Sequence, residues 1–302
     1  MITGFSHFHI STFILIRITY FESDMSLFIA SLNSGSNGNC YYIGNDREAI
    51  FVDAGISCGE IEKRMDRLGL PMEKVKAIFV SHEHTDHILG IPVLAKKYQL
   101  PVYITSHTYQ ETGFHIAKQL VYPFEAHRPV QLGNLCITGF PKMHDAVDPH
   151  SFIITSGEIT VGVFTDIGKP CEHVIHHFKK CHAAFLETNY DEERLTKGRY
   201  PVFLKNRIRS EKGHLSNMQA LDLFIEHRPA FMSHLLLAHL SKENNHPAIA
   251  EAMFASEAGG TKIVLASRDR ETEIYYIGKS DLRYNLQRKT GKKSHQTQLS
   301  LF

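Results

Sequence analysis

Hydrophobic and polar positions alternate in short blocks along most of this chain. Between residues 27 and 53, three apolar runs are separated by Gly, Ser and Asn, a pattern typical of successive strands joined by tight turns. Residues 58–70 place apolar side chains at i, i+4 and i+7, which predicts an amphipathic helix, and residues 76–80 then form an apolar run typical of a buried strand. The chain therefore opens with β-structure followed by a helix and a strand.

The rest of the chain continues this alternation. Helices are predicted over residues 86–99, 171–180 and 217–227 and after Pro247, and strands over residues 101–105, 183–188, 234–238, 262–267 and 273–278, with most of residues 123–165 also in strands. Strands and helices that alternate throughout predict an α/β fold in which sheets are covered by outer helices. We expect one domain, from about residue 25 to residue 280.

Composition adds few constraints. With 302 residues, 43% of them hydrophobic and 22% charged, the chain is long enough to bury a large core. Its net charge of +1 does not by itself require a nucleic-acid or membrane partner. The five cysteines are scattered and form no C-x-x-C pair, which favours a reducing compartment and hence a cytoplasmic location.

Residues 1–24 stand apart from this pattern. Their apolar stretch is shorter than the roughly 20 residues that cross a bilayer, carries Arg17, and lacks the basic start and the cleavage site of a signal peptide. We interpret this segment as an N-terminal extension and expect no membrane association. Because a clean strand pattern begins directly after Met25, our hypothesis is that Met25 is the native start.

The most informative segment is SHEHTDH, residues 81–87. It begins at the end of a predicted buried strand, so His82 and His84, two residues apart in extended chain, point to the same side. Asp86 and His87 follow on the next turn. One short segment can therefore offer two imidazoles to one cation, and a carboxylate with an imidazole to a second cation nearby.

Two metals need further ligands, and functional groups in α/β proteins gather beyond the carboxyl ends of strands. His144, Asp166 and His239 each follow a predicted strand as His82 does. His214 instead precedes a predicted helix that Ser216 or Asn217 would cap, a position suited to a substrate-facing group or one that supports the ligands. The histidines of the predicted helix at 171–180, namely His173, His176 and His177, are expected on the surface.

These residues carry a family resemblance. The H-x-H-x-D-H motif, together with Asp53 in VDAG and with His144, Asp166 and His239, resembles the metallo-β-lactamase superfamily. More narrowly, SGSNGNCYYI, HDAVDP, FLETNYD, GHLSN and AHLSKENN resemble its YycJ/WalJ branch, which is similar to DNA-processing nucleases. The resemblance implies an αββα sandwich with metals at the edge of the paired sheets.

The resemblance also implies a division of labour among the ligands. His82, His84 and His144 would hold one metal, Asp86, His87 and His239 the other, and Asp166 would bridge the two. FLETN and GHLSN resemble ribonuclease Z elements, which implies that Glu187 and His214 assist the departure of the leaving oxygen. Asp86 would orient a metal-activated hydroxide. Ligands that are all N and O are compatible with either Zn²⁺ or Mn²⁺.

The substrate hypothesis depends on residues 197–212, where six basic residues stand against one acid and Tyr200 and Phe203 are interleaved. Such a segment could hold phosphates at the mouth of the metal site, or could simply be a solvated basic loop. We expect a metal-dependent phosphodiesterase, a DNA exonuclease of replication or repair. The alternative is a small-molecule ester or thioester hydrolase similar to glyoxalase II. A β-lactamase is disfavoured because the common di-zinc enzymes have Cys where Asp166 stands.

The last segment, residues 281–302, is predicted to be a flexible basic tail that ends in QLSLF. This motif resembles the short peptide with which bacterial replication and repair proteins bind the sliding clamp. Gln298 would anchor one end of the clamp's groove, while Leu301 and Phe302 would fill an apolar pocket there. Leu299 is the fourth residue predicted to bind the clamp. The alternative is a terminal strand that docks on the protein's own sheet.

Overall fold

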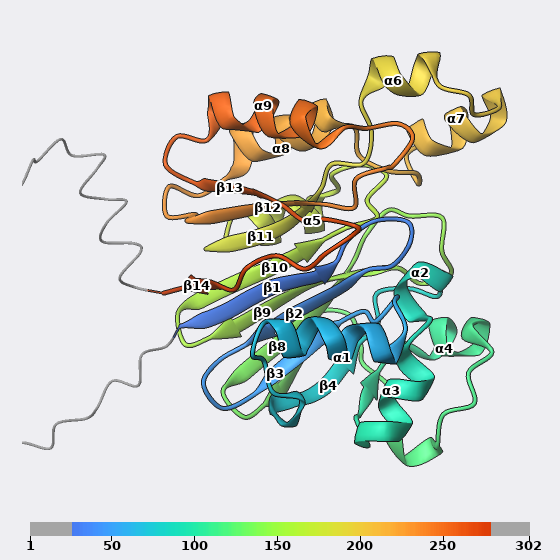
Figure 1. Ribbon diagram of the computed structural model, residues 1–302, viewed down its shortest axis with the longest axis vertical. Coiled ribbons are helices and arrows are strands. Elements are labelled where there is room, and N and C mark those ends of the chain that lie inside the picture. Colours follow the sequence, from blue (N-terminus) through green and yellow to red (C-terminus); the bar gives the residue numbers. More distant parts are fainter. Residues whose placement is uncertain (1–25, 279–302) are drawn as a thin grey trace, which may run out of the picture.

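The computed structural model describes residues 26–278 (Figure 1). The predicted N-terminal extension and the predicted tail with its QLSLF motif lie outside the described residues, and the domain limits at 25 and 280 stay predictions. No helix within residues 26–278 is long and apolar enough to cross a membrane.

The elements follow the predicted alternation. The strands are β1 Leu27–Asn33, β2 Cys40–Gly44, β3 Ala49–Val52, β4 Val75–Phe79, β5 Val102–Tyr103, β6 Val121–Tyr122, β7 Pro129–Leu132, β8 Leu135–Pro141, β9 His150–Ser156, β10 Ile159–Phe164, β11 Ala183–Glu187, β12 His234–Ala238, β13 Lys262–Leu265 and β14 Tyr275–Ile277. The helices are α1 Cys58–Arg67, α2 Thr85–Ile88, α3 Ile91–Tyr98, α4 Ser106–Thr112, α5 Glu172–Phe178, α6 Glu192–Lys197, α7 Val202–Arg209, α8 Asn217–His227 and α9 Pro247–Glu257, with short 3₁₀ turns at Met72–Lys74 and Lys118–Leu120.

Two seven-stranded sheets form the centre of the molecule. The first has the order β14-β1-β2-β3-β4-β5-β6 and the second β13-β12-β11-β10-β9-β8-β7. The pairs from β14 to β3 are antiparallel and those from β3 to β6 are parallel. In the second sheet the pairs from β7 to β10 are antiparallel and those from β10 to β13 are parallel. Both sheets therefore follow the same sequence of pairings.

Helices cover the outer faces of both sheets (Figure 1). Apolar side chains from both inner faces meet between the sheets, including Ile29, Tyr41, Phe152 and Phe185. A second apolar cluster joins the first sheet to α1 and α3, and a third joins the second sheet to α5, α8 and α9. The fold is thus the predicted αββα sandwich.

Local signals explain where several helices begin. The Ser57 side chain accepts a hydrogen bond from the Glu60 backbone N–H at the start of α1. At α8, Ser216 and Gln219 form a reciprocal capping box, so the cap expected at Ser216 or Asn217 falls on Ser216.

The single helix predicted over residues 86–99 is wrong, because the chain forms two helices there. The Gly90 N–H bonds to the Ala54 carbonyl across the loop, and a Cβ at Gly90 would lie 2.1 Å from the Ile56 carbonyl oxygen. Pro92 stands at the first turn of α3, where a missing N–H is tolerated. The backbone therefore leaves α2 after Ile88 and restarts at Ile91.

Two further expectations need correction. His177 is buried, not on the surface: its ring stacks on Phe140 at a centroid separation of 4.1 Å. His173 and His176 are exposed as expected. The basic segment at 197–212 is mostly helical, because it contains the end of α6 and the whole of α7.

Candidate metal centre

The candidate residues meet at one edge of the sandwich, beyond the ends of the central strands. Three of the residues there leave their strands with left-handed backbone: Asp53 after β3 (φ 60°), Asp166 after β10 (φ 55°) and His239 after β12 (φ 55°). This conformation costs a non-glycine residue about 1–2 kcal/mol. Local strain of this kind is concentrated at functional sites, where the surrounding structure enforces it.

The first donor group consists of three histidines. His82 Nε2 lies 3.1 Å from His84 Nδ1, which lies 3.3 Å from His144 Nε2. His82 comes from the β4 end, His84 directly precedes α2, and His144 follows β8. The Nδ1 of His144 donates to the Gly213 carbonyl at 3.1 Å, which leaves its Nε2 free to act as a ligand. Three imidazole nitrogens therefore face one point.

The second donor group contains Asp86, His87 and His239. Asp86 Oδ2 lies 3.7 Å from His87 Nε2 and 3.6 Å from His239 Nε2. Close packing beneath this group requires a glycine, because a Cβ at Gly55 would lie 1.7 Å from the Asp86 carbonyl oxygen. The structure thus brings together the same three residues that the resemblance assigned to one metal.

Asp166 lies between the two groups. Its Oδ2 is 3.1 Å from His87 Nε2 in the second group, and its Oδ1 is 3.9 Å from His144 Nε2 in the first. Asp166 Oδ2 and His239 Nε2 are both buried, and neither makes a hydrogen bond of good geometry within residues 26–278; the approach of Asp166 Oδ2 to His87 Nε2 is an ion-pair contact. Buried polar atoms in proteins are almost always paired, so these two fit the role of ligand atoms. The residues present therefore fit divalent cations.

The electrostatics of the centre support this fit. Burial lowers the pKa of His82 well below its usual range and that of His144 to about 3, so both imidazoles are neutral and ready to bind a cation at pH 7. For His87, burial opposes the charged form, but the carboxylates of Asp166, Asp53 and Asp86 outweigh burial and raise its pKa to about 10. The cluster of carboxylates thus favours a positive charge at its centre.

Glu187 and His214 stand beside this centre in different environments. Glu187 is completely buried, and its Oε1 accepts hydrogen bonds from Nδ1 of His214 at 2.7 Å and Nδ1 of His239 at 2.9 Å. Its Oε2 accepts from the Ile167 backbone N–H at 2.7 Å. Burial raises the pKa of Glu187, but His214 and His239 outweigh it and hold the pKa at about 2. The His214 side chain remains 21% exposed.

Several residues that sequence reasoning left without a role hold the ligands in place. Asp53 accepts from His87 Nδ1 at 2.7 Å and from the Ser81 backbone N–H at 2.8 Å. Asn39 Nδ2 lies 3.0 Å from His87 Nε2. The buried Lys142 donates to the Thr165 carbonyl at 2.8 Å, directly before Asp166. Of these supporting residues, only Asp53 could have been recognised from the sequence, because it directly follows a predicted strand.

Asp145 connects the centre to α7. Its Oδ1 is buried, forms no hydrogen bond with the described part of the chain, and lies 3.4 Å from His144 Nε2. Its Oδ2 accepts from Arg207 Nε at 2.5 Å. Burial raises the pKa of Asp145, but the bond to Arg207 and the charges of His144 and Arg207 lower it below its usual value. The basic helix and the first donor group therefore share one carboxylate.

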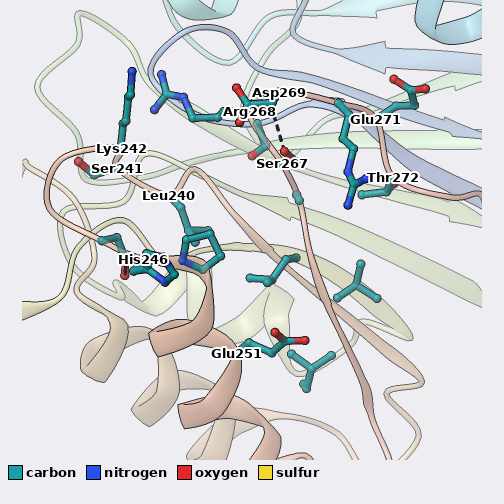
Figure 2. A pocket seen from close by; sticks show the side chains of 18 of the residues that line it. Leu240, Ser241, Lys242, His246, Glu251, Ser267, Arg268, Asp269, Glu271 and Thr272 are labelled. Carbon is teal, nitrogen blue, oxygen red and sulfur yellow. Dashed lines mark hydrogen bonds between the residues drawn. The ribbon is translucent and has the colours of Figure 1, made fainter.

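A groove of about 850 Å³ adjoins the centre, because Leu240, the residue after His239, lies in its lining. Figure 2 shows this groove from close by. The groove is lined in part by Ser34 and Leu240. The Ser34 hydroxyl accepts a hydrogen bond from the His239 backbone N–H at 2.8 Å. Lys242 and Arg268 extend from the loops that border it (Figure 2). None of the seven candidate ligands lines this groove, so it is a neighbour of the metal centre and not the centre itself.

Comparison with known proteins places the fold and the centre in a class. The model of the metallo-beta-lactamase superfamily matches residues 34–197. The chain belongs to this superfamily and is a metal-dependent hydrolase. A solved structure of the metallo-beta-lactamase fold protein YhfI from Bacillus subtilis superposes with a TM-score of 0.64 at 19% identity, over 84% of this chain and 99% of that chain.

Within the superfamily, the chain is similar to YycJ and WalJ, as its motifs predicted. It is 34% identical to a protein named exodeoxyribonuclease YycJ from Bacillus anthracis, over 75% of this chain and 87% of that protein. It is 31% identical to exodeoxyribonuclease WalJ from Streptococcus pneumoniae serotype 2, over 78% of this chain and 89% of that protein. The predicted YycJ/WalJ-like branch is thereby confirmed.

Proposed function

We propose that this protein is a metal-dependent exodeoxyribonuclease that acts in DNA replication or repair. The observation that carries the proposal is the pair of donor groups joined by Asp166, in a chain whose relatives are named exodeoxyribonucleases. The ligands are His82, His84 and His144 for one cation and Asp86, His87 and His239 for the other, with Asp166 between them. Zn²⁺ and Mn²⁺ both suit this set of N and O donors.

Two divalent cations bound there would activate water and neutralise charge on a phosphodiester. Asp86, whose side chain is 25% exposed, orients the attacking water. His214 protonates the departing oxygen through Nε2, because its Nδ1–H is engaged by Glu187. Glu187 is too deeply buried to meet the substrate, so its part is to fix the tautomer and orientation of His214 and His239.

The test is degradation of end-labelled single- and double-stranded DNA and RNA by the full chain with Mn²⁺ or Zn²⁺. His84→Ala and Asp86→Ala should abolish cleavage, while His115→Ala, which removes an exposed histidine far along the chain from the motif, should not. Metal content measured on each variant separates lost binding from lost chemistry. A wild type that hydrolyses a glutathione thioester and leaves every polynucleotide intact would contradict the nuclease and favour the small-ester hydrolase.

The same proposal gives the C-terminal segment a use. Gln298, Leu299, Leu301 and Phe302 would bind a bacterial sliding clamp and hold the nuclease at DNA, with the basic tail as a tether. Clamp pull-down with the full chain should lose its signal when residues 298–302 are removed. Equal recovery with and without these five residues would exclude clamp binding through this motif.

A further inference from the structure

The C-terminal end of helix α7 contacts residues of the metal centre. The His214 backbone N–H donates to the Ile208 carbonyl at 2.9 Å, and the next residue back, Gly213, accepts from His144. A Cβ at Gly213 would lie 2.1 Å from the Ile208 carbonyl oxygen, so only glycine allows this close approach. Arg207 adds its bond to Asp145. The C-terminal end of α7 is therefore fixed relative to the donor groups.

The opposite end of α7 presents two apolar side chains to solvent. Val202 is 72% exposed and Phe203 is 74% exposed. Among the large apolar side chains of residues 26–278, these two are the most exposed. The helix is nevertheless anchored, because Leu204 and Ile208 pack into a small apolar cluster that also contains Tyr190, Leu195 and Tyr200. The exposure of Phe203 is thus a feature of a packed helix and not of a loose segment.

The segment that carries this apolar tip is positively charged. Residues 192–212, which include α6 and α7, contain seven basic and three acidic residues. Arg199 and Lys212 are exposed and form no ion pair within the described part of the chain. An aromatic side chain among free cations at a phosphodiester-cleaving centre matches the surfaces that bind single-stranded nucleic acid. Charge complementarity therefore favours a polyanion as the occupant.

The spacing is also suitable. Phe203 precedes Ile208, which contacts the centre through His214, by five residues, and this separates them by about 7.5 Å along the helix axis. This is about twice the roughly 3.4 Å rise between successive nucleotides of a strand. A strand whose terminal phosphodiester lies at the cations would pass the tip a few nucleotides further on.

We propose that Phe203, with Val202 beside it, is a stacking platform for the bases of the DNA strand that enters the metal centre. The proposal rests on the function proposed above and adds the element that holds the unpaired strand. Arg199 and Lys212 attract its phosphates, while the ring of Phe203 stacks on a base without regard to sequence. Specificity for a polynucleotide over a small phosphodiester would then arise at α7.

Two measurements on the full chain test this. In the first, Phe203→Ala should lower kcat/KM for a single-stranded oligodeoxynucleotide about tenfold, since stacking on one base is worth roughly 1–3 kcal/mol. Hydrolysis of bis(p-nitrophenyl) phosphate, which is too small to reach the tip, should not change. Phe203→Trp should restore oligonucleotide cleavage. Tyr276→Ala, which removes an exposed aromatic side chain from β14, is the matched control and should have no effect.

In the second, a phosphorothioate oligonucleotide containing 2-aminopurine reports stacking without cleavage. Its fluorescence should be quenched by wild type and by Phe203→Trp, and not by Phe203→Ala. Quenching that depends on Phe203 in a protein that cuts no DNA would count against the proposed nuclease and support this platform.

Three results would overturn the platform. The first is equal activity of wild type and Phe203→Ala on the oligonucleotide, and the second is a parallel loss on the small ester. The third is a Phe203-dependent change in sedimentation, which would identify the tip as a contact between copies or with another protein.

Discussion

The two sheets share one order of pairings but contribute to the metal centre in different ways. Asp53 follows β3 and Asp166 follows β10, the strands at which each sheet changes from antiparallel to parallel pairing. Both residues have left-handed backbone. Asp53 is enclosed and supports His87 from behind, whereas Asp166 faces both donor groups. Equivalent places in the topology thus carry a supporting residue in one half and the candidate shared ligand in the other.

The halves also differ in how their candidate ligands are distributed. The first half supplies His82, His84, Asp86 and His87 from one short segment between β4 and α3. The second supplies His144, Asp166 and His239 singly, after three different strands. A local motif is fixed by the geometry of a few residues, while the scattered set depends on the alignment of β8, β10 and β12. Disturbing each half should therefore have distinguishable consequences.

The largest effect is expected from Asp166→Asn. An amide cannot serve both donor groups as a carboxylate does, so we expect kcat/KM on DNA to fall by at least about a thousandfold. Metal analysis should show loss of bound cation at the same time. If the variant keeps both cations and its activity stays within about tenfold of wild type, Asp166 is not shared between the two donor groups.

Asp53→Asn should have a smaller effect. It weakens the acceptor for His87 Nδ1 without removing a ligand, and changes of this kind cost roughly 10–100-fold in metal affinity or activity. Activity should return at raised Mn²⁺ concentration, which Asp166→Asn should not allow. If Asp53→Asn proves as damaging as Asp166→Asn under saturating metal, the two aspartates do not differ in the way proposed.

Chelation tests how the metal centre joins the halves. His144 and His239 belong to one half and the H-x-H-x-D-H segment to the other. Bound cations should therefore link the two halves and stabilise the folded protein. At a concentration 100 times Kd, a ligand adds about 2.7 kcal/mol of stability, or roughly 5–10 °C in Tm for a domain of this size. Removal of metal by EDTA, followed by calorimetry, should lower Tm by that amount, and readdition of Mn²⁺ should restore it.

The smallest effect concerns His177, which lies on the outer layer of the second sheet only. Burial, and then the nearby His176 and Lys180, lower the pKa of His177 to about 4. The unfolded chain binds a proton there near pH 6.5, so the free energy of unfolding should decrease as pH falls from about 6.5 to about 4. His177→Leu should remove roughly 1–2 kcal/mol of that decrease. Urea unfolding of metal-free protein at pH 6.5 and 4.5 measures it, and identical pH dependence in the two proteins would contradict the assignment.

Prediction from the sequence was strongest where the pattern was local. The helix predicted at 217–227 matches α8, and the strand predicted at 234–238 matches β12, because apolar periodicity and a Ser cap define them. It was weakest where a distant segment intervened. The bond between Gly90 and Ala54 splits the predicted helix at 86–99, and packing against Phe140 buries His177. Neither contact could be read from the segment it changes.

The same division holds for the candidate site. By itself the sequence determined that one segment carries four ligand-type side chains, since their spacing within six residues fixes which side they face. Only the tertiary structure decided that Glu187 engages both His214 and His239, and that the Gly213 carbonyl orients His144. It also decided that α7 is attached to the centre at its C-terminal end and exposes Phe203 at its other end. Those relations depend on the positions of separate strands and helices, which packing of the two sheets sets and which residue spacing along the chain does not encode.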